Sequence, residues 1–196
     1  MIILASASPR RKEILSSLGV DFTVITADID ESSKLTDPRL LTEELASKKG
    51  RAVWDILQKG YGNIDPKDAI IISADTVVYA NEKILGKPCN AKNAERMLRS
   101  LSGSSHTVVS GIAITANGLT KSASCSTKVN VDIVPDAELV RYANSIEPLD
   151  KAGGYAIQGG FSPWISSIEG CYFNVVGLPV NCLNKLFWEC TGRYLF

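Results

Sequence analysis

The stretch AIIISADTVVY, residues 69–79, decides the fold class of this chain. It opens with a continuous apolar run of the kind that a β-strand shows when both of its faces are covered. The less apolar residues Ser73 to Thr76 interrupt the run before it continues. The segment therefore predicts a buried strand region with a polar break in its middle.

Helix signals stand on both sides of this strand in the sequence. Helix starts are marked by a capping residue or by a proline at the first helical position, and helix ends by glycine. Short apolar runs mark strands, and Asn117-Gly118 is typical of a hairpin turn between two more. The expected helices span residues 9–18, 38–59, 91–101, 135–145 and 179–190, and the expected strands include residues 2–5, 22–25, 69–72, 77–79 and 164–168.

Strands mixed with helices in this order predict an α/β fold in three layers, with a mixed sheet and helices on both of its sides. A chain of 196 residues is long enough for one well-filled domain or at most two small lobes. We expect a single domain over residues 1–196.

The composition excludes several classes of function. Lys and Arg total 21, as do Asp and Glu, so the net charge of zero offers no overall attraction to nucleic acid or anionic lipid. No apolar run approaches the roughly 18 residues of a membrane span. The five cysteines form no CxxC pair, and no basic region precedes the first apolar stretch, which indicates a reduced, cytoplasmic protein.

His106 is the only histidine, and it lies in the strand-like run HTVVSGIAI. Any catalytic arrangement that needs an imidazole would depend on it, and a zinc site with several imidazoles cannot be built. No candidate nucleophile or carboxylate is close to it in sequence, so a structural role is favoured. If the protein is an enzyme, its catalysis must then rest on carboxylates, Lys and Arg, with or without a hard metal ion bound by oxygen ligands.

Ser6, Ser8, Arg10 and Arg11 crowd the turn from the first expected strand into the first helix. Backbone N–H groups at a helix N-terminus can bind phosphate, whereas two arginines at that positive end oppose the helix dipole. A bound anion explains this arrangement better than helix stability does. A solvated basic turn is the alternative.

Lys49 falls inside the apolar stripe of the long second helix, which is unusual for a lysine. The lysine either belongs to a site or extends past the core to reach water. The expected stripe consists of Leu41, Leu45, Ala52, Val53 and Ile56.

Asp75 follows the three isoleucines, so its carboxylate should be partly withdrawn from water and should need a cation. A catalytic or metal-binding carboxylate is one interpretation, and a structural salt bridge or a backbone cap is the other. Glu31, next to Asp28 and Asp30 in an acidic loop, is a candidate second ligand for Mg²⁺ or Mn²⁺. The alternative is a loop that is simply solvated.

Two further side chains stand in loops with special backbone geometry. Lys87 lies between Gly86 and Pro88, so its backbone is extended and its side chain can be aimed at one point. Gln158 lies in GGYAIQGG, residues 153–160, where the backbone can approach a planar ligand and the amide can read donor and acceptor edges. This loop or bulged strand lacks the GxGxxG and Walker spacings, which counts against those sites.

Taken together, these segments resemble the Maf family of nucleotide pyrophosphatases associated with septum formation. The matching blocks occur in the family's order along essentially the whole chain. They are SASPRRKE (6–13), ADT (74–76), LGKP (85–88), LSG (101–103), DKAG (150–153), AIQG (156–159) and VGLP (176–179).

The resemblance implies a metal-dependent hydrolase that cuts a nucleoside triphosphate between its α and β phosphates, releasing a monophosphate and pyrophosphate. It implies the fold of the inosine triphosphate pyrophosphatases, with two lobes flanking a groove, and a homodimer. Asp75 matches the proposed general base. Arg10, Thr76 and Gln158 match positions associated with base selection, and the AIQG block resembles the branch that acts on dTTP and UTP.

The expected site combines two sets of side chains. Glu31 and Asp75 hold or orient Mg²⁺ or Mn²⁺. The triphosphate and the leaving pyrophosphate are bound and neutralised by Ser6, Ser8, Arg10, Arg11, Lys49 and Lys87.

Some positions depart from the family pattern and bear on substrate preference more than on reaction type. Gly154 and Ala156 stand where the family more often has Ala and Gly, Ser73 replaces a usual glycine, and residues 161–164 are an atypical continuation. Two alternative functions stay open. One is a non-catalytic nucleotide-binding regulator of cell division, and the other is the same reaction on a modified purine nucleotide such as 7-methyl-GTP.

Overall fold

The main helices begin where the capping residues and prolines of the sequence predict. The computed structural model describes residues 1–196 except the side chain of Asn63. Helix α2 (Pro38–Gln58) starts after Asp37, whose carboxylate accepts hydrogen bonds from the N–H groups of Arg39 and Leu40 at 2.8 and 3.1 Å. This cap satisfies donors that the first turn of a helix leaves without partners.

The other helix starts follow the same logic. Helix α3 (Ala91–Leu101) begins after Asn90, whose side chain accepts a hydrogen bond from the N–H of Asn93 at 2.8 Å. Ser8 is the N-cap of α1 (Pro9–Ser17), although the described residues give its side chain no capping hydrogen bond. The remaining helices are α4 (Asp136–Ala143), α5 (Tyr172–Val176) and α6 (Val180–Thr191).

The described residues form one mixed sheet of seven strands in the order β2-β1-β3-β5-β6-β7, with β4 paired to β3. Strand β1 pairs in parallel with β2 and β3, while β3 with β4 and β6 with β7 are antiparallel. The sequence-predicted mixed α/β fold is therefore confirmed. The strands are β1 (Ile2–Leu4), β2 (Thr23–Val24), β3 (Ile70–Ala80), β4 (Lys83–Leu85), β5 (Ser105–Ala116), β6 (Leu119–Val131) and β7 (Ile165–Glu169).

Strand β3 differs from its prediction because it is continuous. The polar residues 73–76 do not break it, since Ser73 is buried and its hydroxyl donates a hydrogen bond to the carbonyl of Ala46 at 2.7 Å. The hairpin turn between β5 and β6 is confirmed. Asn117 and Gly118 have φ values of 50° and 76°, as a two-residue turn of type I′ requires.

The chain groups into two compact units, and strands β3, β5 and β6 contribute residues to both. The expected single domain over residues 1–196, with a groove between two lobes, stays a prediction. Unit 1 comprises residues 1–75, 110–125 and 177–196, and unit 2 comprises residues 76–109 and 126–176.

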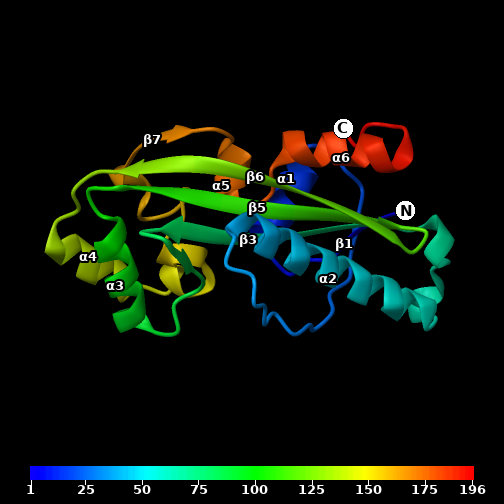
Figure 1. The fold of residues 1–196 in the computed structure, drawn as a ribbon, viewed down its shortest axis with the longest axis horizontal. Helices are drawn as coiled ribbons and strands as arrows, with labels where there is room; N and C mark the ends of the chain where they lie inside the picture. Colours follow the sequence, from blue (N-terminus) through cyan, green and yellow to red (C-terminus); the bar gives the residue numbers. More distant parts are fainter. The chain divides into compact units, whose positions relative to one another are not determined.

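Within unit 1, helices α2 and α6 lie on opposite sides of the strands (Figure 1). Two glycines allow α2 to approach the sheet closely. A Cβ atom on Gly111 of β5 would lie 2.2 Å from the carbonyl carbon of Thr42, and one on Gly50 of α2 would lie 2.7 Å from Oγ1 of Thr115. The backbone of α2 therefore lies directly against β5 at Gly111, and Gly50 lies against the side chains of Thr115 in β5 and Ser73 in β3.

The buried face of α2 is not the one that was predicted. The expected stripe is wrong at Leu41, Ala52 and Ile56, which are only half-buried, because small residues turn a neighbouring face toward the sheet. The residues that are buried are Thr42, Leu45, Ala46, Gly50, Val53 and Leu57.

We expect Gly111→Ala to lower the free energy of unfolding by about 2 kcal/mol or more, because the added methyl group meets backbone atoms that cannot rotate away. Urea unfolding followed by circular dichroism measures the change. Gly86→Ala is the control, since a Cβ there meets no described atom within 4 Å. Equal midpoints for both variants would show that α2 is not packed this closely.

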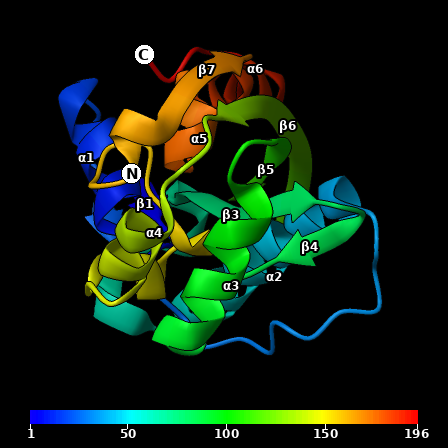
Figure 2. The same cartoon turned by 90° about the vertical axis from the view of Figure 1, so that its left-hand side faces the viewer.

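Unit 2 has a core of its own, in which α3 and α4 pack against strands β5 and β6. Both helices are labelled in Figure 2. An aromatic cluster of Tyr142, Tyr155 and Phe161, with ring centroids 5.3 to 5.4 Å apart along Tyr142–Phe161 and Tyr155–Phe161, completes this core. In the part of the chain that the structure describes, no helix combines the length and the apolar character needed to cross a membrane.

Candidate active site

Three of the predicted site residues meet in unit 1. The Nζ atom of Lys49 lies 2.6 Å from Oδ1 of Asp75 and 2.9 Å from Oε1 of Glu31. The exposed fractions of the side chains are 18% for Lys49, 13% for Asp75 and 61% for Glu31. A partly buried lysine therefore joins two carboxylates that are 44 residues apart in sequence.

The register of α2 on β3 explains why these residues meet. Alternate residues of a strand share one face, so Ser73 and Asp75 point to the same side of β3. Ser73 bonds to the carbonyl of Ala46 in α2, and this bond fixes the helix against that face. Lys49 comes three residues after Ala46 and is thereby brought to Asp75.

Lys49 is the cation that the partly buried carboxylate of Asp75 was expected to need. The ion pair with Lys49 replaces the water that the carboxylate loses, and an unpaired carboxylate here would cost several kcal/mol. A lysine that only reaches past the core to water is ruled out by the same contact. The salt-bridge interpretation of Asp75 describes the structure.

Arg11 is the second cation near Asp75, and its guanidinium is engaged by protein atoms. Nη1 donates to the hydroxyl of Ser6 at 3.0 Å and to the carbonyl of Ala74 at 2.9 Å, and Nε donates to the carbonyl of Gly177 at 2.9 Å. Burial lowers the pKa of Arg11, and the charge of Asp75 raises it. The guanidinium group thus connects the turn before α1, the strand residue that precedes Asp75, and the turn before α6.

The other residues of the first turn lie close by. The N–H of Ser8 donates to the hydroxyl of Ser6 at 3.3 Å, so both serines belong to one small turn. Arg10 is half-buried at the start of α1, and its charge acts on Arg11. The described contacts of Ser6 and Arg11 are with the protein itself, and their binding of phosphate stays a prediction.

Thr76, Lys87 and Gln158 belong to unit 2. Thr76 is half-buried in β3, while Lys87 and Gln158 are exposed in loops. The N–H of Gly153 donates to the carbonyl of Gly86 at 3.0 Å, which joins the segment of Lys87 to the glycine-rich segment. The structure thus brings two of the predicted loop motifs together within this unit.

His106 has the structural role that its sequence context favours. It is 3% exposed, and its Nε2 atom lies 2.6 Å from the hydroxyl of Tyr155. Burial lowers the pKa of His106 to about 4, so the imidazole is neutral at pH 7. His106 supports the aromatic cluster of unit 2.

The candidate donors for a metal ion are the carboxylates of Glu31 and Asp75. Among the described residues, no group of three or more His, Cys, Asp and Glu side chains is arranged to hold a metal ion. Mg²⁺ commonly binds through one or two carboxylates together with substrate phosphates, so two carboxylates that share a lysine fit such an ion. The contact with Lys49 uses Oδ1 of Asp75, and the carboxylate has a second oxygen, Oδ2.

Sequence reasoning missed the residues that set this geometry. Gly50 follows Lys49 and permits the close approach of α2, while Gly111 provides the same clearance on β5. Ser73, which was noted as part of a polar break and as a departure from the family pattern, supplies the bond between β3 and α2. A glycine inside a core-facing helix was the signal that could have found the first of these.

The fold and this set of charged residues define an α/β domain with a carboxylate-lysine centre, and comparison with known proteins places it in a family. A family profile described as Maf-like protein matches residues 1–190, and the chain belongs to this family. A dTTP/UTP pyrophosphatase of Desulforamulus reducens is 43% identical over 185 residues, covering 93% of this chain and 92% of that protein.

Other relatives carry the same name and are similar to this chain to about the same degree. A dTTP/UTP pyrophosphatase of Thermosipho africanus is 42% identical over 96% of this chain and 92% of its own length. One of Clostridium beijerinckii is 44% identical over 96% of this chain and 98% of its own length. The chain is thus similar to these proteins along nearly its whole length.

Proposed function

We propose that this protein is a metal-dependent nucleoside triphosphate pyrophosphatase that hydrolyses dTTP and UTP to the monophosphate and pyrophosphate. The observation that carries the proposal is the contact of Lys49 with both Glu31 and Asp75. It brings two carboxylates and a cation to one place, a combination that suits hydrolysis of a polyphosphate. The names of the similar proteins supply the two nucleotides.

In this proposal, Asp75 accepts a proton from the water molecule that attacks the α phosphorus. The bond from that phosphorus to the oxygen bridging to the β phosphorus breaks, and pyrophosphate leaves with the electron pair. Lys49 holds Asp75 through Oδ1 and so fixes the direction of the carboxylate. The charges of Lys49 and Arg10 offset the negative charge of the triphosphate and of the leaving group.

Mg²⁺ or Mn²⁺, held by Glu31 and Asp75, would neutralise phosphate charge and acidify a water molecule. We expect EDTA to abolish the release of pyrophosphate from UTP and an excess of Mg²⁺ or Mn²⁺ to restore it. Enzymatic detection of pyrophosphate measures this. Full activity in EDTA, after treatment of the protein with the chelator, would contradict the proposed metal requirement.

The substrate is tested by comparing kcat/KM for dTTP, UTP, CTP, GTP and 7-methyl-GTP, with both products identified. We expect dTTP and UTP to give the highest values. A preference for 7-methyl-GTP would support the modified-purine alternative, and nucleotide binding without turnover would support a regulator. The expected homodimer and cytoplasmic location stay predictions, and sedimentation of the purified protein tests the first.

A further inference from the structure

Glu31 needs an explanation because its side chain is 61% exposed and nevertheless meets Lys49. It lies in the segment of residues 25–37, which connects β2 to α2. An exposed side chain receives little help from packing, so its place depends on what holds its backbone. The anchors of this segment therefore bear on the candidate site.

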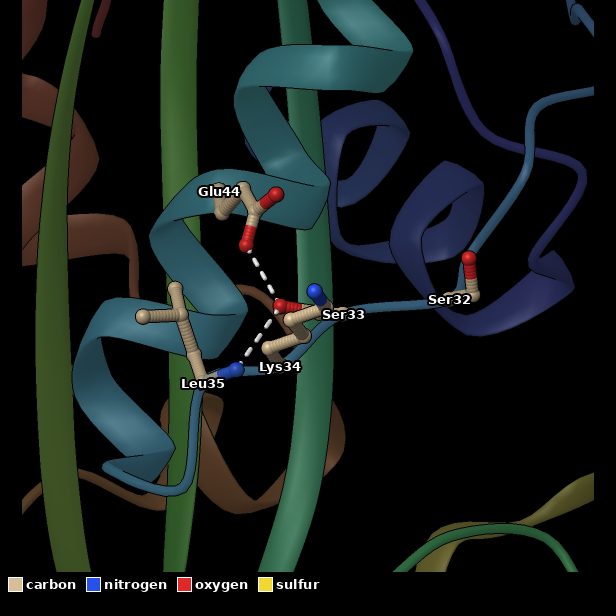
Figure 3. A pocket seen from close by; sticks show the side chains of 5 residues that line it. All are labelled: Ser32, Ser33, Lys34, Leu35 and Glu44. Atoms are coloured by element: carbon tan, nitrogen blue, oxygen red, sulfur yellow. Dashed lines mark hydrogen bonds between the residues drawn. The ribbon is translucent and has the colours of Figure 1, made fainter.

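Four residues fasten the segment to α2, and we call them the latch: Ser32, Ser33, Glu44 and Lys48. Oε2 of Glu44 accepts a hydrogen bond from the hydroxyl of Ser33 at 2.6 Å (Figure 3). Oε1 of Glu44 pairs with Nζ of Lys48 at 2.8 Å, and the same Nζ donates to the carbonyl of Ser32 at 3.1 Å. Both oxygens of one carboxylate are thus used to hold two successive loop residues.

The latch also organises the loop beyond it. The hydroxyl of Ser33 accepts a hydrogen bond from the N–H of Leu35 at 3.2 Å, which turns the chain toward the start of α2 (Figure 3). A pocket on the side of α2 is lined by Ser32, Ser33, Lys34, Leu35 and Glu44 (Figure 3). Hydrogen bonds from Lys48 and Ser33 lower the pKa of Glu44, so the carboxylate that the latch needs is ionised at neutral pH.

The latch is close enough to Glu31 to set its position. Oδ1 and Oδ2 of Asp30 accept hydrogen bonds from the N–H and the hydroxyl of Ser32 at 2.8 and 2.7 Å, so Glu31 is enclosed in a small closed turn. Ser32 in turn is bonded to Lys48, the neighbour of Lys49 on α2. One helix therefore carries the lysine of the candidate site and the anchor of the loop that brings Glu31 to it.

We propose that Glu44 is a positioning residue, which acts through Ser33 and Lys48 to hold Glu31 against Lys49. The expected effect of Glu44 on catalysis rests on the proposed function, whereas its expected effect on the loop does not. It assigns no contact with substrate to Glu44. Its role follows from the hydrogen bonds that join α2 to residues 32 and 33.

The first test is hydrogen exchange of the protein alone, without nucleotide or metal. We expect Glu44→Ala and Ser33→Ala to speed the exchange of the amides of residues 31–36 by about tenfold or more. Glu95→Ala is the control, because Glu95 forms an ion pair of the same spacing with Arg99 on α3 and has a similar exposure, 30% against 34% for Glu44. Unchanged exchange in Glu44→Ala would overturn the latch.

The second test separates positioning from a general loss of stability. We expect Glu44→Ala to lower kcat for UTP about tenfold, and Glu95→Ala to leave it unchanged. In a Glu31→Gln background the Glu44→Ala substitution should have no further effect, since the residue it positions has already lost its charge. If Glu44→Ala lowered kcat by the same factor in the Glu31→Gln background as in the parent protein, the proposal would be overturned. A parent protein without pyrophosphatase activity would refute the proposed function, and the exchange result would still decide the latch.

Discussion

Replacing Asp75 by Asn is expected to lower the turnover of UTP by about 100-fold or more, the scale of a positioned base or metal ligand. The change is nearly isosteric and removes the charge that Lys49 contacts at 2.6 Å. It leaves the backbone of β3 and the bond between Ser73 and Ala46 in place. The loss should therefore appear in kcat while the protein stays folded.

Steady-state kinetics with UTP, together with a circular dichroism spectrum, measures this effect. Asp55→Asn is a suitable control, because Asp55 is an exposed residue on α2 outside the candidate site. A folded Asp75→Asn variant with the parental rate would refute the proposed mechanism.

Replacing Lys49 by Ala is the second large effect, and it should change both catalysis and stability. The variant loses a cation for the triphosphate and leaves Asp75, which is 13% exposed, without the ammonium that it contacts. We expect kcat/KM for UTP to fall about 10- to 100-fold. The stability loss should lie between the roughly 1 kcal/mol of an exposed ion pair and the 3–5 kcal/mol of a buried one.

The kinetic constants and the urea midpoint are measured on the same preparations. Lys59→Ala, at the exposed end of the same helix, is the matched control and should behave as the parent. Because Lys49 and Asp75 touch, their double variant should lose less activity than the product of the two single losses. Parental kinetics in Lys49→Ala would mean that the pair only stabilises the fold.

Most of the secondary structure could be predicted because its signals are local. Asp37 and Asn90 cap the helices that follow them, and the Asn117-Gly118 turn forms the hairpin that its composition indicates. The short elements α5 and β4 were missed. Helix α5 has five residues and β4 has three, which is too short for a helical or strand period to show in their sequences.

The face of α2 could not be predicted from hydrophobicity alone. The helix turns Thr42, Ala46 and Gly50 to the sheet because small side chains allow the two backbones to approach each other. The buried hydroxyl of Thr42 donates a hydrogen bond to the carbonyl of Pro38 in the same helix at 2.9 Å. A ranking by apolar character places such residues outside the core. Contact with a particular neighbour, Gly111, decides the matter.

In the candidate site, too, the sequence singled out individual residues but could not predict their contacts. The cost of burying a carboxylate singled out Asp75, and an unusual place on an apolar helix singled out Lys49. That these two residues form a pair, and that Glu31 joins them, depends on the register of α2 against β3. The contacts of Arg11 with the carbonyls of Ala74 and Gly177 were likewise invisible, because these partners come from distant segments.

Hydrolysis of UTP in ¹⁸O-labelled water is the most direct measurement of whether this centre delivers water to the α phosphorus. Mass spectrometry of the two products should find one ¹⁸O atom in UMP and none in pyrophosphate. Label in pyrophosphate, or products other than UMP and pyrophosphate, would contradict the proposed reaction.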